Sequence, residues 1–467
     1  MTEVEIRPLG PDDDMDAQLD LVERVFGVVS AAERENRKRR VAENIAQGRF
    51  LGAFVQGRPA GSAAYLDMRQ WWHGRPVPMA GVTSVKVAPE HRGRGIGRRM
   101  MTELLGQIAE RGYPVSALYP ATMPVYRSLG WEPAGGRYKV TVPSRELRSL
   151  LGPDSAAFPD DTVAFPEGGV RPHGSAAPGA EVRRATPDDA AEVIEVLGKV
   201  HEAGRHSGPL TRDAESVRRW LDRDAPYAYL AADGFLAYQW NGDDEMYAER
   251  IVAASAETCR ALWSVLASHS STARTIRAKL APEDPLWWLT RERDVALAQR
   301  SLWMLRIVDA PAAIAGRGFP LSVSLSVPLV VRDPARPSND GRWRLEIAGG
   351  KGTLTQEASS ASATHAAVGA HAVGGAHVAG GAHEVGGAQT VGGAQAASGA
   401  HVAGRAHAAS VGEDEPLTLG ARGLAALYGG TPMTTLRHAG LVSGGSPDTD
   451  AALDAAFPGP SFMLDDF

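Results

Sequence analysis

The chain has 467 residues, more than a single hydrophobic core can serve, so about three domains are expected. Its 55 acidic and 49 basic residues give a net charge of -6, which argues against a nucleic-acid partner and suits a cationic, amine-bearing substrate. The single cysteine, Cys259, excludes an internal disulfide and a cysteine-based metal site.

Two further classes are disfavoured by the distribution of apolar residues. No uninterrupted apolar run reaches the ~20 residues that a membrane-spanning helix needs. The opening segment, MTEVEIRPLG, carries acidic side chains and lacks the apolar stretch of a secretion signal. We therefore expect a protein without a membrane span that works in the cytoplasm.

The beginning of the chain predicts a strand, an amphipathic helix and a hairpin. Residues 5–9 indicate the strand, and the helix follows it. Residues 49–54 and 61–67 predict two more strands, joined by a turn at 56–59. The basic segment 34–40 is interpreted as a solvated helix face.

Residues 81–109 predict a strand, a glycine-rich turn and a helix. The strand carries valines and is closed by Pro89, which has no N–H to pair. The turn Arg92-Gly93-Arg94-Gly95-Ile96-Gly97 lets backbone approach a ligand closely, because glycine has no Cβ. The helix after it has apolar residues on one side, from Met100 to Ile108. A turn of this kind at a helix start is an anion site that a diphosphate fits.

Three phosphate-binding motifs compete for this turn. A Walker loop needs Gly-Lys-Ser/Thr, and Gly97 is followed by arginines instead. A Rossmann turn needs G-x-G-x-x-G, and the glycine spacing is wrong. Arg92, Gly95 and Gly97, placed after a V-x-V-x-P strand, resemble the acetyl-CoA-binding core of the GNAT superfamily of N-acetyltransferases. That resemblance implies acetyl-CoA as co-substrate, bound by Val85, Lys86, Val87, Arg92, Gly93, Arg94, Gly95, Ile96, Gly97, Arg98, Ala121 and Thr122.

The next segment narrows the resemblance. Residues 115–119 predict a strand, and the sequences Leu118-Tyr119-Pro120 and Val125-Tyr126-Arg127-Ser128-Leu129-Gly130-Trp131 follow. They resemble the enhanced intracellular survival (Eis) acetyltransferases. The resemblance implies an α/β (α+β) architecture: two GNAT-like domains with central mixed sheets flanked by helices, and a C-terminal sterol-carrier-protein-like α/β domain. It also implies a homohexamer.

The domains expected on this basis are 1–145, the catalytic GNAT domain, and 181–315, a degenerate GNAT-like domain. The Pro-, Gly- and Ala-rich segment 146–180 between them is interpreted as a linker. The element order of the second domain repeats that of the first, but no R-x-x-G-x-G turn occurs, so we expect no second cofactor site. Four of its tryptophans are interpreted as core or interface residues: Trp263, Trp287, Trp288 and Trp303.

The third domain, 316–467, is interrupted by a low-complexity insert at 358–412. Within it, residues 364–408 repeat every six residues around a fixed alanine that His or Gln follows. A hexapeptide β-helix needs larger apolar residues at one fixed position, so a flexible loop is the preferred interpretation. Metal binding by the histidines is the alternative, and we expect no metal.

The chemistry of acetyl transfer assigns roles to three groups. The amine must lose a proton, the tetrahedral oxyanion needs a donor and the departing thiolate needs a proton. The backbone N–H of Val85 suits the oxyanion. In the family that this chain resembles, Tyr126 is the general acid; without that resemblance, a core tyrosine with a hydrogen-bonded hydroxyl would be preferred. The resemblance also makes the α-carboxylate of Phe467 the candidate base, and Asp465 and Asp466 are expected to add negative charge beside it.

We therefore expect an acetyl-CoA-dependent N-acetyltransferase that acetylates primary amines of an aminoglycoside-like or polyamine substrate by direct attack. Residues 31–40, near where this family shapes its acceptor pocket, contain no aromatic residue, so acceptor preference is expected to differ. One alternative is a protein-lysine acetyltransferase. Another is a lipid-binding or structural protein with a vestigial GNAT domain, against which the intact turn and Tyr126 speak.

Overall fold

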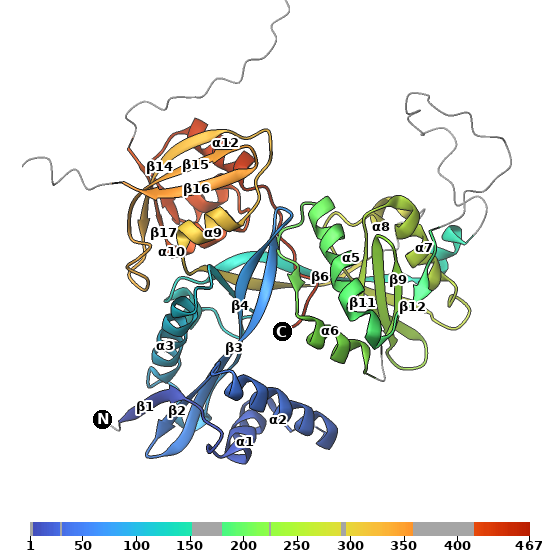
Figure 1. Ribbon diagram of the computed structural model, residues 1–467, viewed down its shortest axis with the longest axis horizontal. Coiled ribbons are helices and arrows are strands. Elements are labelled where there is room, and N and C mark those ends of the chain that lie inside the picture. The colour runs from blue at the N-terminus through green and yellow to red at the C-terminus, as the bar shows by residue number, and fades with distance from the viewer. Residues whose placement is uncertain (1–2, 29, 152–179, 224–225, 291–295, 358–414) are drawn as a thin grey trace, which may run out of the picture.

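The computed structural model describes residues 3–28, 30–151, 180–223, 226–290, 296–357 and 415–467. The six-residue repeat at 364–408 and most of the expected linker lie outside the described residues. Figure 1 shows three lobes, with the N-terminal, the central and the C-terminal parts of the chain each forming one of them. The predicted α/β class and the three-domain architecture are confirmed.

The first lobe follows the predicted order of strand, helix, hairpin, strand and helix. Asp14 caps the first helix, its side chain accepting from the N–H of Ala17, which explains why the helix begins directly after the acidic segment. The elements are β1 (Val4–Pro8), α1 (Met15–Phe26), α2 (Ala31–Ala46), β2 (Phe50–Val55), β3 (Arg58–Trp72), β4 (Arg75–Val87), η1 (Pro89–His91), α3 (Ile96–Glu110), β5 (Val115–Leu118), α4 (Pro124–Arg127), β6 (Glu132–Pro143) and η2 (Ser144–Leu150).

The second lobe repeats this order with shorter strands. Its elements are β7 (Arg183–Arg184), η4 (Pro187–Asp189), α5 (Ala190–Ala203), β8 (Leu210–Thr211), α6 (Ala214–Leu221), β9 (Tyr227–Ala231), β10 (Gly234–Trp240), β11 (Glu245–Ala253), α7 (Ala256–Ala267), β12 (Thr275–Leu280), α8 (Leu286–Leu289) and β13 (Ala296–Ile307). Of the four tryptophans expected in a core or interface, Trp263 and Trp303 are buried, whereas the side chain of Trp288 is 71% exposed.

The third lobe is a five-stranded sheet of order β16-β15-β14-β17-β18 with helices packed on it. Its elements are α9 (Ala310–Gly316), β14 (Leu325–Arg332), β15 (Gly341–Ala348), β16 (Lys351–Gln356), β17 (Leu417–Gly420), α10 (Ala421–Tyr428), α11 (Met433–His438), β18 (Val442–Ser443) and α12 (Pro447–Ala456). The buried core of this lobe continues into residues of the first lobe, among them Trp72 and Met79.

One sheet runs through the first two lobes. Its order is β1-β2-β3-β4-β5-β13-β6-β12-β11-β10-β9-β7. The last strand of each lobe has changed places: β13, from the second, pairs with β5, and β6, from the first, pairs with β12. Figure 1 shows β6 passing between the two lobes. The backbone groups along both strands are thereby paired, and the two lobes are fixed to each other by sheet hydrogen bonds.

A buried guanidinium joins the third lobe to the first. Arg317 is 1% exposed and lies between the rings of Tyr428 and Phe457, both at 4.5 Å, and those of Phe319 and Trp72. It donates to the carbonyl of Tyr428, and burial lowers its pKa to about 10. Desolvated cation–π contacts of this kind contribute about 2 kcal/mol or more, so this residue helps fix the position of the third lobe.

Candidate active site

The site lies where strands β4 and β5 separate. They are paired in parallel only from Met79 to Val82, so the β5-facing edge of β4 is unpaired beyond Val82 in the described structure. The register between β3 and β4 also shifts here, and Ser84 takes a φ of 56°. A bulge of this type re-aims backbone groups and is common beside active sites. The strand therefore presents Val85 and its backbone to the opening.

The N-terminus of α3 faces the same opening without a side-chain cap. Its N-cap, Gly95, has a φ of 75°, which is accessible to glycine at little cost, and no side chain caps the first turn. A Cβ at Gly93 or Gly95 would meet no atom within 4 Å, so the space in front of the turn is open. The first turn contains no acidic residue. Free N–H groups and the positive end of the helix dipole make this a site for an anion.

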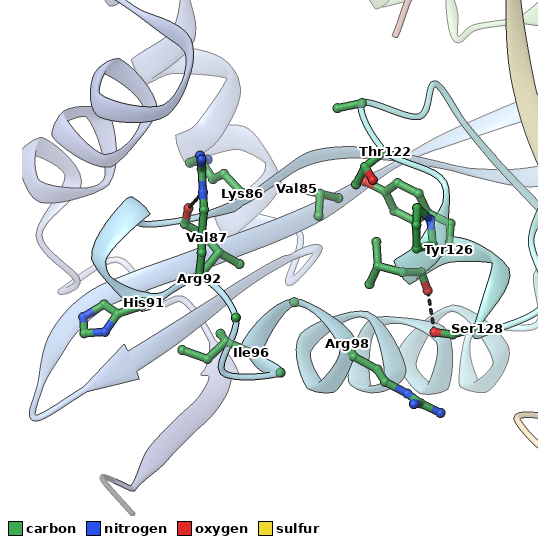
Figure 2. Close-up of a pocket in the computed structure, with 16 residues that line it drawn as sticks. Val85, Lys86, Val87, His91, Arg92, Ile96, Arg98, Thr122, Tyr126 and Ser128 are labelled. Atoms are coloured by element: carbon green, nitrogen blue, oxygen red, sulfur yellow. Dashed lines mark hydrogen bonds between the residues drawn. The ribbon is translucent and has the colours of Figure 1, made fainter.

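Together these elements enclose a cavity of about 480 Å³ (Figure 2). Of the predicted cofactor residues, all but Arg94 line it; Arg94 is exposed. The lining residues are Val85, Lys86, Val87, His91, Arg92, Gly93, Gly95, Ile96, Gly97, Arg98, Ala121, Thr122, Pro124, Val125, Tyr126 and Ser128. His91, Pro124, Val125 and Ser128 were not predicted. Pro124 and Val125 belong to the short helix that carries Tyr126, and Ser128 follows it. Their closeness to Tyr126 in the sequence could have indicated that they line the same cavity.

Tyr126 lies on the wall opposite β4, across the cavity from Val85 (Figure 2). The residue is only 5% exposed, and its hydroxyl has no hydrogen-bond partner among the described residues. Burial raises its pKa to about 12. A core tyrosine would be expected to satisfy its hydroxyl within the protein; this one presents a protonated hydroxyl to the cavity.

Lys86 is a buried residue of β4 that also lines the cavity. Its side chain is 4% exposed, its ammonium is 5.6 Å from the centre of the Phe50 ring, and it donates to the carbonyl of Ser84 at 3.4 Å. No carboxylate is paired with it in the described part of the chain. Burial, helped by the charge of Arg37, lowers its pKa to about 8.

Phe467 reaches the same opening from the opposite face of the sheet. The centre of its ring is 5.1 Å from that of Tyr119, with the two rings tilted by 44°, and the ring lies over Gly81, where a Cβ would approach it to 3.0 Å. It packs with the core cluster that includes Met79 and Ala117, whereas Tyr126 belongs to the cluster under α3. The two predicted catalytic residues thus lie on opposite faces of the sheet, at the point where β4 and β5 part.

Asp465 and Asp466 were expected to add negative charge beside Phe467, but both are paired with cations. Asp465 is buried and forms an ion pair with Arg250. Asp466 is paired with Lys279 at 2.5 Å and with Arg137. The Phe467 carboxylate, in contrast, forms no ion pair within the described residues. The charge of the tail that remains available is that of its last residue.

Comparison with known proteins defines the class. Acetyltransferase (GNAT) domain families match residues 5–134 and 208–307, and a sterol carrier protein domain family matches residues 310–400. Each match falls in a different lobe, the second beginning after α5 and the third ending before β17. The protein is an acetyltransferase with two GNAT domains and a C-terminal sterol carrier protein domain, and enzymes of this class use acetyl-CoA.

Relatives identify the family within that class. The chain is 32% identical to the N-acetyltransferase Eis of Mycobacterium tuberculosis over 328 residues, which cover 66% of this chain and 74% of the relative. It is 26% identical over 359 residues to an uncharacterised N-acetyltransferase of Streptomyces avermitilis, covering 71% of this chain and 80% of that one. The chain therefore belongs to the family of Eis N-acetyltransferases.

Solved structures agree with this assignment over the whole chain. A GCN5-related N-acetyltransferase from Kribbella flavida superposes with a TM-score of 0.79 at 36% identity, covering 100% of this chain and 99% of the other. One from Anabaena variabilis has the same fold, with a TM-score of 0.73 at 21% identity and full coverage of both chains. None of the helices in the described ranges is both long and apolar enough to cross a membrane.

Proposed function

We propose that this enzyme transfers the acetyl group of acetyl-CoA to a primary amine of a small cationic molecule, by direct attack of the amine on the thioester. The observation that carries the proposal is the placement of Tyr126 and Phe467 on opposite faces of one opening in the sheet. One face receives the cofactor and the other the amine, so the two reactants meet between the separated strands.

In this proposal the cofactor occupies the 480 Å³ cavity. Its diphosphate lies against the backbone of Gly93 to Gly97, where the uncapped α3 offers free N–H groups. The guanidinium of Arg92 donates to the carbonyl of Val87 on β4 at 3.4 Å, so its positive charge lies beside the turn. The extended arm of the cofactor runs along Val85 and Val87, whose strand edge is unpaired and can accept it as an added strand.

The reaction makes a C–N bond and breaks a C–S bond. The amine attacks the thioester carbonyl, and the negative charge that develops on its oxygen is stabilised by the N–H of Val85. Collapse of the intermediate expels the thiolate of the cofactor. One proton leaves the attacking nitrogen and one is gained by the sulfur, so the products are an amide and a thiol.

Tyr126 is assigned the proton on the sulfur side. Its pKa of about 12 keeps it protonated at any working pH. A free thiol has a pKa of about 8.5, which would make the transfer uphill. However, the same desolvation that raises the pKa of Tyr126 also raises that of a thiol in this cavity, which brings the two groups closer.

The Phe467 carboxylate is assigned the proton on the amine side, directly or through a water. A terminal carboxylate has a pKa of about 3.5, so it is ionised but intrinsically weak as a base for an ammonium. Its contribution is therefore mostly its position beside the amine. On the resemblance to Eis enzymes, the proposal extends to a homohexamer located in the cytoplasm; light scattering of the purified protein tests the homohexamer.

The experiment is acetyl-CoA turnover, followed by thiol release, across aminoglycosides, polyamines and lysine peptides. Turnover of the small polyamines or aminoglycosides, with product masses increased by one acetyl group, supports the proposal. Turnover of lysine peptides alone would replace it with protein acetylation. Absence of thiol release with every amine, in a protein that is folded, would leave only the lipid-binding alternative.

A further inference from the structure

The last residues of the chain are threaded between the first two lobes. The N–H of Phe462 donates to the carbonyl of Ser207, and that of Met463 to the carbonyl of Gly136 on β6. A Cβ at Gly208 would collide with the backbone of Phe462, so only glycine permits this close approach. The route of the tail is therefore set by backbone contacts with both lobes.

Beyond this passage, cations of the second lobe hold the two aspartates. Asp465 accepts from the N–H of Leu210 at 2.9 Å and pairs with Arg250 on β11. Asp466 pairs with Lys279 on β12 at 2.5 Å. The side chain of Arg250 is 9% exposed and that of Lys279 is 5% exposed. Because both cations are buried, dissolved salt screens these ion pairs less than it screens surface pairs.

Two further arginines complete the set of cations. The guanidinium of Arg212, which follows β8, donates to the main-chain carbonyl of Asp466. Arg137 on β6 pairs with the Asp466 carboxylate and lies 4.7 Å from the centre of the Tyr119 ring. Four cations therefore hold the last two aspartates, and the carboxylates of Glu249 and Asp213 act on two of these cations, Lys279 and Arg212.

We infer that Arg250 and Lys279 are positioning residues for catalysis: by fixing Asp465 and Asp466, they place the Phe467 carboxylate at the opening between β4 and β5. This inference rests on the proposed function, in which that carboxylate receives the proton of the amine. It also gives the second lobe a role in the reaction, although no R-x-x-G-x-G turn occurs in it.

The arrangement suits this role for a physical reason. Phe467 follows the anchored residues directly, so two fixed side chains restrict the conformations of its carboxylate, and preorganisation is the main asset of a weak base.

The rival explanation is that these ion pairs only stabilise the fold. A double-mutant cycle separates the two, because it measures whether two changes act through the same group. One change is Arg250→Met or Lys279→Met. The other appends a short Gly-Ser segment after Phe467, which keeps the ring and converts the carboxylate to an amide. Arg277→Met is the matched control, since Arg277 is on the same strand as Lys279 but pairs with Glu245 instead.

We expect Arg250→Met and Lys279→Met each to lower kcat at least tenfold without weakening acetyl-CoA binding, and Arg277→Met to have no effect. Arg250→Lys, which keeps the charge, should restore much of the rate. In the extended chain, neither methionine substitution should lower kcat further. Lys279→Met is the safer variant for folding, because Asp466 keeps its ion pair with Arg137. The side chain of Asp466 is also 58% exposed.

The outcomes distinguish this inference from the proposed function. If the extended chain turns over at the wild-type rate, the carboxylate is not the base, and both fall. If the extension abolishes turnover while folded Arg250→Met and Lys279→Met proteins keep wild-type kcat, the inference alone is overturned. Losses that add fully to that of the extension would show that the ion pairs act on something other than Phe467, which also overturns it.

Discussion

The two GNAT-like lobes have the same order of elements and differ at one helix N-terminus. In the first, α3 begins after Gly95 with no side-chain cap and no acidic residue in its first turn. In the second, the corresponding α7 is capped by Ser255, whose side chain accepts from the N–H of Thr258, and Glu257 lies in its first turn. The first N–H groups of α3 are therefore open to a ligand. In α7, the Ser255 cap accepts one of these N–H groups and Glu257 adds a negative charge.

The comparison teaches that loss of a cofactor site need not mean loss of a role. The second lobe provides the strand that pairs with β5 and two of the cations that hold the tail. Its sheet remains continuous with that of the first lobe. In the proposed function, one lobe binds the cofactor and the other supports the site from behind.

The largest effect is expected from removing the acid of the first lobe. Tyr126→Phe keeps the ring and removes only the hydroxyl, so kcat should fall by roughly 10²–10⁴ while acetyl-CoA affinity is unchanged. Tyr229→Phe, on β9 of the second lobe, is the control and should leave kcat unaffected. The wild-type rate should also show no loss from ionisation of Tyr126 between about pH 7 and about pH 10, because its pKa is near 12.

The second prediction concerns the buried ammonium of the first lobe. Lys86 lies one residue before the end of β4, and the corresponding residue of β11 is Val252. Its pKa falls from 10.5 to about 8 on folding, so the unfolded chain binds more protons between these values and stability rises with pH across them. The cost of burying the charge is fully present below pH 8 and amounts to about 3 kcal/mol at most.

Lys86→Met should therefore raise the free energy of unfolding at pH 7, and the gain should shrink as pH approaches 10.5. Denaturant unfolding at several pH values measures it. Lys199→Met, on the surface of α5, is the control and should change stability by less than about 0.5 kcal/mol. A gain that does not depend on pH would mean that packing, not charge, is responsible.

The third prediction tests the open turn. Gly95→Glu places a side chain and a negative charge where the backbone is proposed to meet the diphosphate, so acetyl-CoA affinity should fall at least tenfold, or about 1.4 kcal/mol. Gly106→Glu, in the middle of α3 with open space around it, should leave the affinity unchanged. Unaltered calorimetric binding by folded Gly95→Glu protein would rule out this location.

The smallest effect belongs to the second lobe. Ser255→Ala removes the cap of α7 and should cost about 1 kcal/mol of stability, the usual value for such a cap. Neither kcat nor acetyl-CoA affinity should change, because this helix end binds no cofactor in our account. A loss of cofactor affinity comparable to that of Gly95→Glu would break the contrast between the two helix ends.

The site could be predicted from the sequence where the signal is local. The glycine turn, the strand before it and the helix after it lie within about one supersecondary unit, and their periodicity is sufficient to define them. Apolar residues close to the end of the chain also indicate a buried tail, and Met463 and Leu464 are buried. Arg94 was predicted to bind the cofactor only because it lies within the glycine-rich motif. Some side chains of such a turn point outward, and that of Arg94 is exposed.

The sequence could not predict what depends on distant pairing. Asp465 and Arg250 are 215 residues apart, and nothing in either local sequence indicates that they meet. The sequence places the two aspartates beside the terminal carboxylate but does not show which cations they meet, and for this reason they were expected to add negative charge there. The exchange of β6 and β13 could not be predicted for the same reason, since the sequence of each strand does not indicate that it pairs with a strand of the other lobe.

The central claim is that one lobe binds the cofactor and the other does not. Calorimetric titration of the full chain with acetyl-CoA, in the absence of an amine, tests it most directly. We expect one molecule bound per chain, with an affinity at least tenfold lower in folded Gly95→Glu protein. Two molecules per chain, or one whose affinity is unchanged in Gly95→Glu and falls in a folded Ser255→Glu variant, would contradict the account.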